Sequence, residues 1–222
     1  SCPYKSPTDM GVNMAGNCIF DDEACREASR QEIIRRYYQA LNRMVSGDSS
    51  EEEIYKIELL MKQAKITVDD RKVVGIANVK AAATQAPAAA LELPDGRIVT
   101  GKTGSLLGAS AAVLLNAVKA LGRIPDEKHL IAPSAIEPIQ KLKVNYLGSK
   151  NPRLHTDEVL IALSMCAATD PDAQKALDQL SKLKGCQAHT SVILSRVDIR
   201  TFKTLGVELT SEPIYEHQKL YH

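Results

Sequence analysis

Apolar residues recur at three- and four-residue spacing along several stretches of the chain, which is the pattern of amphipathic helices. The clearest stretch covers residues 106–121, and Gly122 follows it where a C-terminal cap is expected. The pattern therefore predicts one strongly apolar helix, around which we expect the other elements to be arranged. Its apolar positions are Leu106, Leu107, Ala111, Leu114, Leu115, Val118 and Leu121.

An antiparallel hairpin is predicted immediately before this helix. Two short runs, at 90–92 and 97–99, are separated by Pro94-Asp95-Gly96, a strong turn signal. A polar, glycine-rich link at 101–105 then joins the second run to the helix. Backbone N–H groups at such a helix start, together with the helix dipole, can hold an anion.

Residues 1–85 are predicted to form a loop and a helical subdomain. Residues 1–20 mix turn-forming polar residues with a few apolar ones, which favours a loop pinned against a core. Apolar positions at helical spacing follow in three stretches. The expected helix starts are Asp21 or Asp22, a capping box of Ser50 and Glu53, and the pair Thr67 and Asp70.

Residues 86–222 are predicted to form a second subdomain, a mixed sheet with helices on its faces. After the hairpin and the apolar helix, the expected order is strand, helices, strand, helix and strand, an order that resembles the cytidine-deaminase-like arrangement. The expected elements are a strand at 129–132, helices opened by Ser134 with Glu137, by Thr156 and by Asp170, a strand at 190–194, a helix opened by Ser195 with Asp198, and a strand at 207–210.

The zinc chemistry of deaminases is not expected, because its ligands are absent. A zinc deaminase needs His or Cys with Glu at the start of the central helix, and a P-C-x-x-C pair at the next helix. Gly108-Ala109-Ser110 and Pro133-Ser134-Ala135 stand at the corresponding places. We therefore expect neither a metal site nor deamination by that mechanism.

Composition excludes several classes of partner. Lys and Arg number 28 against 27 Asp and Glu, so no field of one sign favours nucleic acid or an anionic membrane. The absence of Trp and the presence of only two Phe argue against a stacking platform for single strands. No apolar run approaches a membrane span, and the first residues lack a signal-peptide pattern. Five cysteines without framework spacing favour a reducing compartment, which we take to be the cytoplasm.

The link before the apolar helix is the first candidate for binding chemistry. The letters from Gly96 to Thr103 match the phosphate-loop expression G-x-x-x-x-G-K-T. The first glycine, however, lies in a hairpin turn, and the residues after it favour a strand, so a true nucleotide loop is not expected. A weaker hypothesis remains, in which Lys102, Thr103 and Ser105 bind a phosphate or carboxylate at the helix entrance, against a plain structural turn.

The second candidate is His155, which stands immediately before a predicted helix. In a functional interpretation His155 transfers protons near neutral pH and is oriented by Asp157 or Glu158. In a structural interpretation Thr156 caps the helix, and the two carboxylates complement its dipole. The first loop adds polar groups that could line the same phosphate site, namely Lys5, Ser6, Thr8, Asp9 and Asn13.

Long stretches of the chain closely resemble the C-terminal part of a bacterial family catalogued as domain of unknown function 1846. The resemblance implies a helical subdomain followed by a deaminase-like α/β subdomain, and a longer protein with an upstream α/β domain containing a phosphate-loop-like segment. It implies no established reaction. The stretches are CPYKSPTDMGVNMAGN, EASRQEIIRRYY, ELPDGRIVTGKT, IEPIQKLKVNYLGSKNPRLHTDEVLIALS and GCQAHTSVILS.

These observations lead to two hypotheses. In the first, the chain is the C-terminal fragment of a cytoplasmic enzyme for a nucleotide or another phosphorylated metabolite, with the upstream domain supplying the main phosphate loop. In the second, it is a non-catalytic oligomerisation or interdomain packing module. In both, the expected partners are the upstream domain and further copies of the same protein, with no nucleic acid and no membrane.

Overall fold

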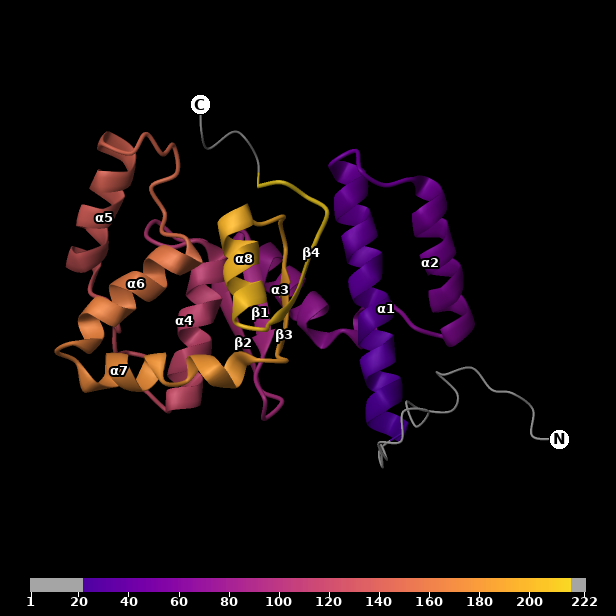
Figure 1. Cartoon of the computed structure of the whole chain (residues 1–222), viewed down its shortest axis with the longest axis horizontal. Coiled ribbons are helices and arrows are strands. Elements are labelled where there is room, and N and C mark those ends of the chain that lie inside the picture. The colour runs from indigo at the N-terminus through magenta and orange to yellow at the C-terminus, as the bar shows by residue number, and fades with distance from the viewer. Residues whose placement is uncertain (1–21, 217–222) are drawn as a thin grey trace. The chain divides into compact units, whose positions relative to one another are not determined.

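The structure is a computed structural model, and it describes residues 22–216 (Figure 1). The chain divides into two compact units, Ser1–Arg71 and Lys72–His222. From the sequence we expected the helices up to about residue 85 to form one subdomain. In the structure the helix after Arg71 belongs to the second unit, because its Val73 and Ala77 pack against Ala90 of the sheet.

The first unit contains the predicted helix pair, α1 (Asp22–Val45) and α2 (Glu51–Ala64). Ile34 and Tyr38 of α1 and Ile54 and Met61 of α2 are buried, as the helical spacing predicts. The Ser50 hydroxyl accepts a hydrogen bond from the Glu53 N–H and so caps α2. A short 3-10 turn, η2 (Val68–Asp70), closes the unit, and its Asp70 carboxylate accepts from the Thr67 N–H at 2.7 Å.

The second unit is built on a mixed sheet. In the described part of the chain four strands form it, in the order β2-β1-β3-β4: β1 (Ala88–Glu92), β2 (Ile98–Lys102), β3 (Gln187–Thr190) and β4 (Glu208–Ser211). β1 is antiparallel to β2 and to β3, whereas β3 and β4 are parallel. β2, β3 and β4 therefore run in the same direction, and their carboxyl ends lie at one edge of the sheet.

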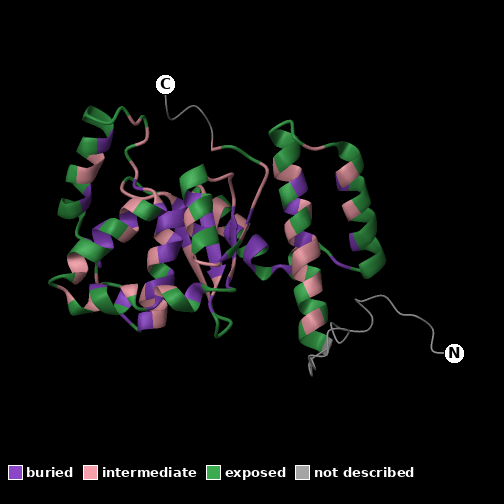
Figure 2. Ribbon diagram, in the orientation of Figure 1, coloured by how far each residue is buried: buried purple, intermediate pink, exposed green. Residues whose placement is uncertain are grey.

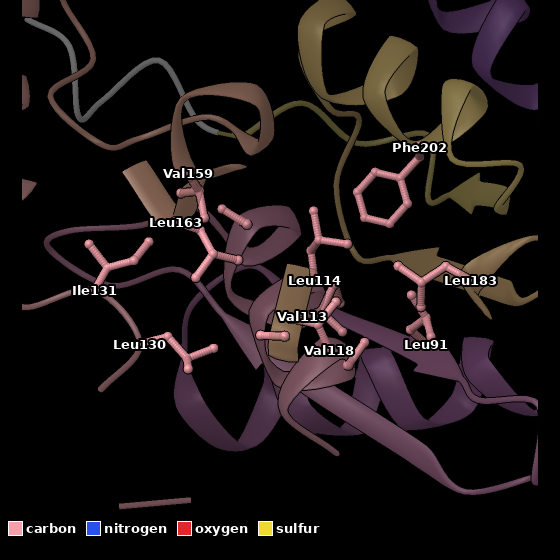
Figure 3. Close-up of a cluster of buried hydrophobic side chains, with 14 of the residues drawn as sticks. Leu91, Val113, Leu114, Val118, Leu130, Ile131, Val159, Leu163, Leu183 and Phe202 are labelled. Carbon is pink, nitrogen blue, oxygen red and sulfur yellow. The ribbon is translucent and has the colours of Figure 1, made fainter. Parts of the chain in front are cut away.

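Helices cover both faces of this sheet. α4 (Ala109–Gly122) and α8 (Arg196–Thr204) pack on one face, where Leu91, Leu114 and Phe202 all belong to the main core (Figure 3). α3 (Lys72–Thr84) covers the other face. The buried positions follow the inner sides of these elements (Figure 2). Three further helices and a 3-10 turn extend the α4 side: α5 (Pro133–Asn145), α6 (Thr156–Ala167), α7 (Pro171–Leu177) and η3 (Leu180–Leu183).

Gly101 of β2 allows α4 to lie directly on the sheet. A Cβ atom built at this position would stand 2.3 Å from the backbone N of Val113, which no real side chain tolerates. The backbone conformation of Gly101 does not require glycine; the proximity of the helix does. α4 is thereby held close to the strand that precedes it.

The predicted hairpin is confirmed, but two of the predicted strands are misplaced. Residues 129–132 form a loop and no strand. Leu130 and Ile131 are apolar because this loop fills the main core (Figure 3). The strand expected at 190–194 lies at 187–190, and the chain turns away at Ser191, whose N–H makes a last bond to the Ala88 carbonyl at 2.9 Å.

Several helix ends also differ from the prediction. α4 begins at Ala109, and Gly122 is its last residue; the cap is Arg123, with φ of 52°. α5 begins at Pro133 with Ala132 as its N-cap, so the box of Ser134 and Glu137 does not open it. The predicted starts at Asp170 and Ser195 are confirmed, since both side chains accept backbone N–H bonds. Thr67 and Asp70, predicted to open the third helix, open only η2, and α3 begins at Lys72.

Candidate functional site

Four loops meet at the edge where β2 and β3 end. The loop after β2 runs beside the segment before α6, because the Leu154 N–H donates to the Leu106 carbonyl at 3.0 Å and the Gly108 N–H donates to the Leu154 carbonyl at 3.5 Å. The loops after β3 and β4 are joined by a bond from the Ile193 N–H to the Ile214 carbonyl at 2.8 Å. The carboxyl edge of parallel strands is where open α/β sheets bind ligands.

α4, α6 and α8 all begin among these loops. The N-terminal end of each helix presents partly positive backbone N–H groups. The loop contacts of Leu154 bring the starts of α4 and α6 together, and a side chain of α8 reaches the start of α6: the Asp198 carboxylate accepts from the Thr156 N–H at 2.9 Å. The backbone N–H groups at this edge are therefore partly positive, and at the start of α6 the Asp198 carboxylate already accepts one of them.

His155 and Asp198 form a hydrogen-bonded pair at the centre of this edge. His155 Nδ1 lies 3.1 Å from Asp198 Oδ2, and the side chain of Asp198 is only 6% exposed, whereas that of His155 is 26% exposed. The Ser195 hydroxyl donates to the same Asp198 oxygen at 2.7 Å and lies 3.4 Å from His155 Nδ1. Asp198 is thus held by groups from α6 and α8 and can orient the imidazole.

The pair shifts the titration of both members. Its hydrogen bond to Asp198 raises the pKa of His155 above the ordinary value, although partial burial opposes the shift. Burial alone would raise the pKa of Asp198, but hydrogen bonds from His155, Ser195 and the Thr156 N–H outweigh burial and lower it. Asp198 therefore stays ionised, and His155 takes up a proton more readily than an ordinary histidine.

The geometry also selects the reactive nitrogen of His155. Because Asp198 can only accept, Nδ1 has the role of donor in the pair. Nε2 has no hydrogen-bond partner among residues 22–216. Nε2 is consequently the atom that can accept a proton from a ligand, or return one to it.

The start of α4 has backbone donors that the helix itself does not use, near the segment that precedes His155. The Thr103 hydroxyl accepts from the Ala109 N–H at 3.2 Å, but the N–H groups of Ser110 and Ala111 have no acceptor within the helix. Ser110 is 3% exposed, and its hydroxyl makes no hydrogen bond within the described part of the chain. Its Oγ points back toward Gly108, where a Cβ atom would stand 3.8 Å from it.

Thr156 has an unexpected role. It was expected to cap α6, but the N-cap is His155, and Thr156 is the first residue of the helix. The Glu158 carboxylate accepts from the His155 N–H at 2.8 Å, in the manner of a capping box. The Thr156 hydroxyl is fully buried and has no partner in residues 22–216, so a buried polar group stays unsatisfied beside Asp198.

The residues predicted around His155 have mainly structural contacts. Glu158 also accepts from the buried Lys143 Nζ at 2.7 Å, which attaches α5 to α6, and Asp157 accepts only from the Glu158 N–H. Neither orients the imidazole of His155; Asp198 does. The Arg153 guanidinium is fixed by the Gly104 carbonyl at 2.8 Å and by Glu216 at 3.2 Å, so its charge is partly neutralised.

The predicted phosphate ligands are only partly brought together. Ser105 lies in the loop beside Leu154 and is exposed, with its carbonyl accepting from Gln140 at 3.0 Å. The Thr103 hydroxyl accepts from the Ala109 N–H at the start of α4, which is a structural role. Lys102 is paired with Ala88, so its side chain projects from the face that α3 covers, opposite to α4. Five predicted ligands lie outside the described residues: Lys5, Ser6, Thr8, Asp9 and Asn13.

The sequence did not point to Asp198 or Ser110 as members of a site. Asp198 was visible only as part of a helix-start pattern with Ser195, and its partner His155 lies 43 residues away. Ser110 was noted only as a residue that cannot bind zinc. Among residues 22–216 no group of three His, Cys, Asp or Glu side chains could hold a metal ion.

The fold and this edge define a class: a mixed α/β protein with a histidine–carboxylate pair at the carboxyl ends of its strands. The family can now be stated, because residues 69–221 match the family described as "Domain of unknown function DUF1846, C-terminal". The chain belongs to this family. Residues 1–65 also match its N-terminal description, which corrects the expectation that the chain represents the C-terminal part alone.

Relatives in several bacteria are similar over nearly the whole chain. A UPF0371 protein of Corynebacterium urealyticum is 55% identical over 99% of this chain and 44% of its own length. One of Corynebacterium glutamicum is 54% identical over 100% of this chain and 45% of its own length. One of Streptococcus pyogenes is 52% identical over 99% and 44%. The chain thus spans less than half the length of the relatives it matches.

No helix in residues 22–216 is long and apolar enough to cross a membrane.

Proposed function

We propose that this chain contributes an acid–base site to an enzyme that acts on a nucleotide or another phosphorylated metabolite. One observation supports the proposal above all: His155 Nδ1 is held 3.1 Å from a buried Asp198, at the edge where α4, α6 and α8 begin. A histidine with its inner nitrogen fixed by a carboxylate and its outer nitrogen accessible is suited to proton transfer.

The anionic part of the ligand would bind at the start of α4. The N–H groups of Ser110 and Ala111 and the Ser110 hydroxyl could together receive one phosphate oxygen. A negative ligand there would also favour the protonated form of His155, which could then donate a proton from Nε2 to a leaving oxygen. In the reverse direction, neutral His155 would accept the proton of an attacking hydroxyl group.

The rest of the ligand would be bound by parts of the longer protein. Relatives are more than twice as long as this chain, so an upstream domain could supply the main phosphate loop. We also propose the cytidine-deaminase-like arrangement for the α/β unit. The hairpin, the helix α4 on its face and the order β2-β1-β3-β4 support it. A cytoplasmic location remains part of the same proposal.

The test is a thermal-shift screen of the intact protein with nucleotides and sugar phosphates. A ligand present well above its Kd should raise the Tm by about 2 °C or more. Ser110→Ala should abolish most of that rise. His155→Ala should reduce turnover of the same ligand by about 100-fold or more, because general acid–base catalysis contributes a factor of this size. His129→Ala, in the loop before α5, is the matched control and should behave as the wild type.

A screen without any ligand-induced shift in the wild type would contradict the proposal. The alternative function, an oligomerisation or packing module, would then be favoured by the apolar residues that α6 and the end of α5 expose. Ile161 and Met165 lie one turn apart on α6, and Tyr146 and Leu147 follow α5. Sedimentation velocity of the intact protein would measure its oligomeric state directly.

A further inference from the structure

β2 is an edge strand of the sheet, and a groove lies beside it. The strand order β2-β1-β3-β4 leaves one side of β2 without a neighbouring strand in the described part of the chain. The groove has a volume of about 750 Å³ and lies between β2 and the C-terminal half of α4. Its walls include Ile98, Val99 and Thr100 of the strand and Asn116, Lys119 and Arg123 of α4 and its C-cap.

The backbone groups of Ile98 and Thr100 point out of the sheet on this side. In an antiparallel pair, residues that bond to the partner strand alternate with residues whose N–H and C=O groups point away from it. The Leu93 N–H donates to the Arg97 carbonyl at 2.8 Å, and the pairing continues in the same register along β2. The odd-numbered residues of β2 therefore bond to β1, and the groups of Ile98 and Thr100 face outward.

Most of these outward groups have no partner. The Thr100 carbonyl accepts from Asn116 Nδ2 at 2.8 Å, and this is the one hydrogen bond that they make within residues 22–216. A carbonyl oxygen can accept a second bond. The two residues thus present two N–H and two C=O groups about 7 Å apart, the spacing that an added strand requires.

The groove contains more positive than negative side chains. Its cations are Arg97, Lys119 and Arg123, against the single carboxylate of Asp126. Arg97 is paired with Asp95 at 2.7 Å. Lys119 Nζ donates to two carbonyl oxygens of the loop after α4, at 2.7 and 2.8 Å, which leave its charge uncompensated. Arg123 is exposed and makes no side-chain hydrogen bond or ion pair within the described residues. Such a groove favours an acidic partner over a basic one.

We infer that β2 binds an extended peptide segment with acidic side chains at alternate positions, as an additional strand of the sheet. The main-chain groups of Ile98 and Thr100 would bond to the segment, and one of its carboxylates would pair with Arg123. A second copy of β2 fits less well, because this strand contains Lys102 and no carboxylate. The inference does not depend on the function proposed for His155, because it uses no residue of that site.

The experiment measures the fluorescence anisotropy of a fluorescein-labelled peptide, TEVEVET, titrated with the intact protein. We expect saturable binding with a Kd below about 1 mM. Two matched peptides test the two parts of the inference. TKVKVKT reverses the charge, and TEVEVET with N-methyl groups on its three central residues cannot bond as a strand. Both should bind at least tenfold more weakly.

Variants of the protein locate the site. Thr100→Pro removes an outward N–H without breaking a bond to β1, a change that edge strands tolerate, and should weaken binding at least tenfold. Arg123→Gln should weaken binding about fivefold, because an exposed ion pair contributes little more. Arg200→Gln, also exposed but on α8 and outside the groove, is the matched control and should bind as the wild type. Circular dichroism checks the folding of each variant, and Arg123→Gln keeps the test decisive if Thr100→Pro does not fold.

Several results would overturn the inference. These are equal binding of the acidic and basic peptides, undiminished binding of the methylated peptide, full binding by a folded Thr100→Pro or by Arg123→Gln, and no binding up to about 1 mM. A dimer in sedimentation velocity that Thr100→Pro dissociates would show that a second copy pairs with β2 instead. Ser110→Ala should leave peptide binding unchanged, which separates this outcome from failure of the phosphate proposal.

Discussion

Two histidine–carboxylate pairs of the α/β unit, one on the α3 face of the sheet and one at the carboxyl edge of its strands, differ in how many imidazole nitrogens have partners. His189, paired with Glu212, has no exposed surface, and both of its ring nitrogens have partners. His155, paired with Asp198, is partly exposed, and only its inner nitrogen is engaged among the described residues. In the first pair the histidine fixes the carboxylate; in the second the carboxylate fixes the histidine. The same two residue types thus form one pair in which both imidazole nitrogens have partners and one pair in which Nε2 has no partner among the described residues.

Replacing each histidine by alanine should give the largest difference in stability between the two pairs. His189→Ala leaves a cavity and removes one hydrogen-bond partner of the buried Thr210 hydroxyl and one of the Glu212 carboxylate. It should lower the free energy of unfolding by about 3–4 kcal/mol, against about 1 kcal/mol for His155→Ala. Urea unfolding of both variants measures the difference. Equal losses would mean that His155 is as structural as His189, and the contrast between the pairs would fail.

The pH dependence of Asp198→Asn should give the next largest effect. The lowered pKa of Asp198 stabilises the fold above its unfolded value of about 4, and this contribution disappears as the pH falls through the folded pKa. The raised pKa of His155 stabilises the fold below about 6.5, and this contribution disappears as the pH rises through the folded pKa. The variant should therefore lose most stability, about 2 kcal/mol, between roughly pH 4 and 6.5.

Unfolding measured from pH 3 to 9 tests this window, and an NMR titration of His155 tests its cause. In Asp198→Asn the pKa of His155 should fall toward the ordinary value. A stability difference that stays constant across the whole pH range would show that the two groups do not titrate as a pair. Ser195→Ala should give a smaller effect of the same kind, because it removes one donor to Asp198 and the cap of α8 but leaves the imidazole contact in place.

The smallest expected effects distinguish a satisfied hydroxyl from an unsatisfied one at the start of α4. Thr103→Val removes the cap of the Ala109 N–H and should lower the free energy of unfolding by about 1 kcal/mol without altering the ligand-induced rise in Tm. Ser110→Ala removes a hydroxyl with no described partner and should change stability by less than about 0.5 kcal/mol while reducing that rise. Differential scanning fluorimetry of both variants, with and without ligand, measures the two effects together. The opposite assignment of effects would return Thr103 to the role of phosphate ligand.

Much of the fold could be predicted because its signals are local. Helical spacing, the Pro94-Asp95-Gly96 turn and the caps at Ser50 and Asp170 act over a few residues, and each is found as expected. The prediction of a strand at 129–132 was wrong because a buried loop and a buried strand can have the same apolar composition. Composition alone cannot separate the two, and in the structure Leu130 and Ile131 belong to a loop that contributes to the main core.

Fewer residues of the candidate site could be predicted from the sequence. His155 was recognised by its chemistry, but its partner was sought among the neighbouring Asp157 and Glu158. These carboxylates are occupied by the first turn of α6 and by Lys143. The true partner comes from another helix, and no spacing in the sequence relates positions 155 and 198. Similarly, Lys102 follows Gly101 directly in the sequence, but the alternation of the strand places its side chain on the opposite face from α4.

The missing side chain at Gly101 has a consequence beyond the packing of one helix. Val113, which would collide with any Cβ there, lies about one turn from the first residue of α4, so the strand and the helix start form a single rigid joint. A methyl group at this joint would tilt the helix outward and carry the Ser110 hydroxyl away from Leu154 and the imidazole beside it. The distance between the Ser110 hydroxyl and the His155 imidazole therefore depends on the absence of a side chain at Gly101, a residue that does not belong to the proposed site.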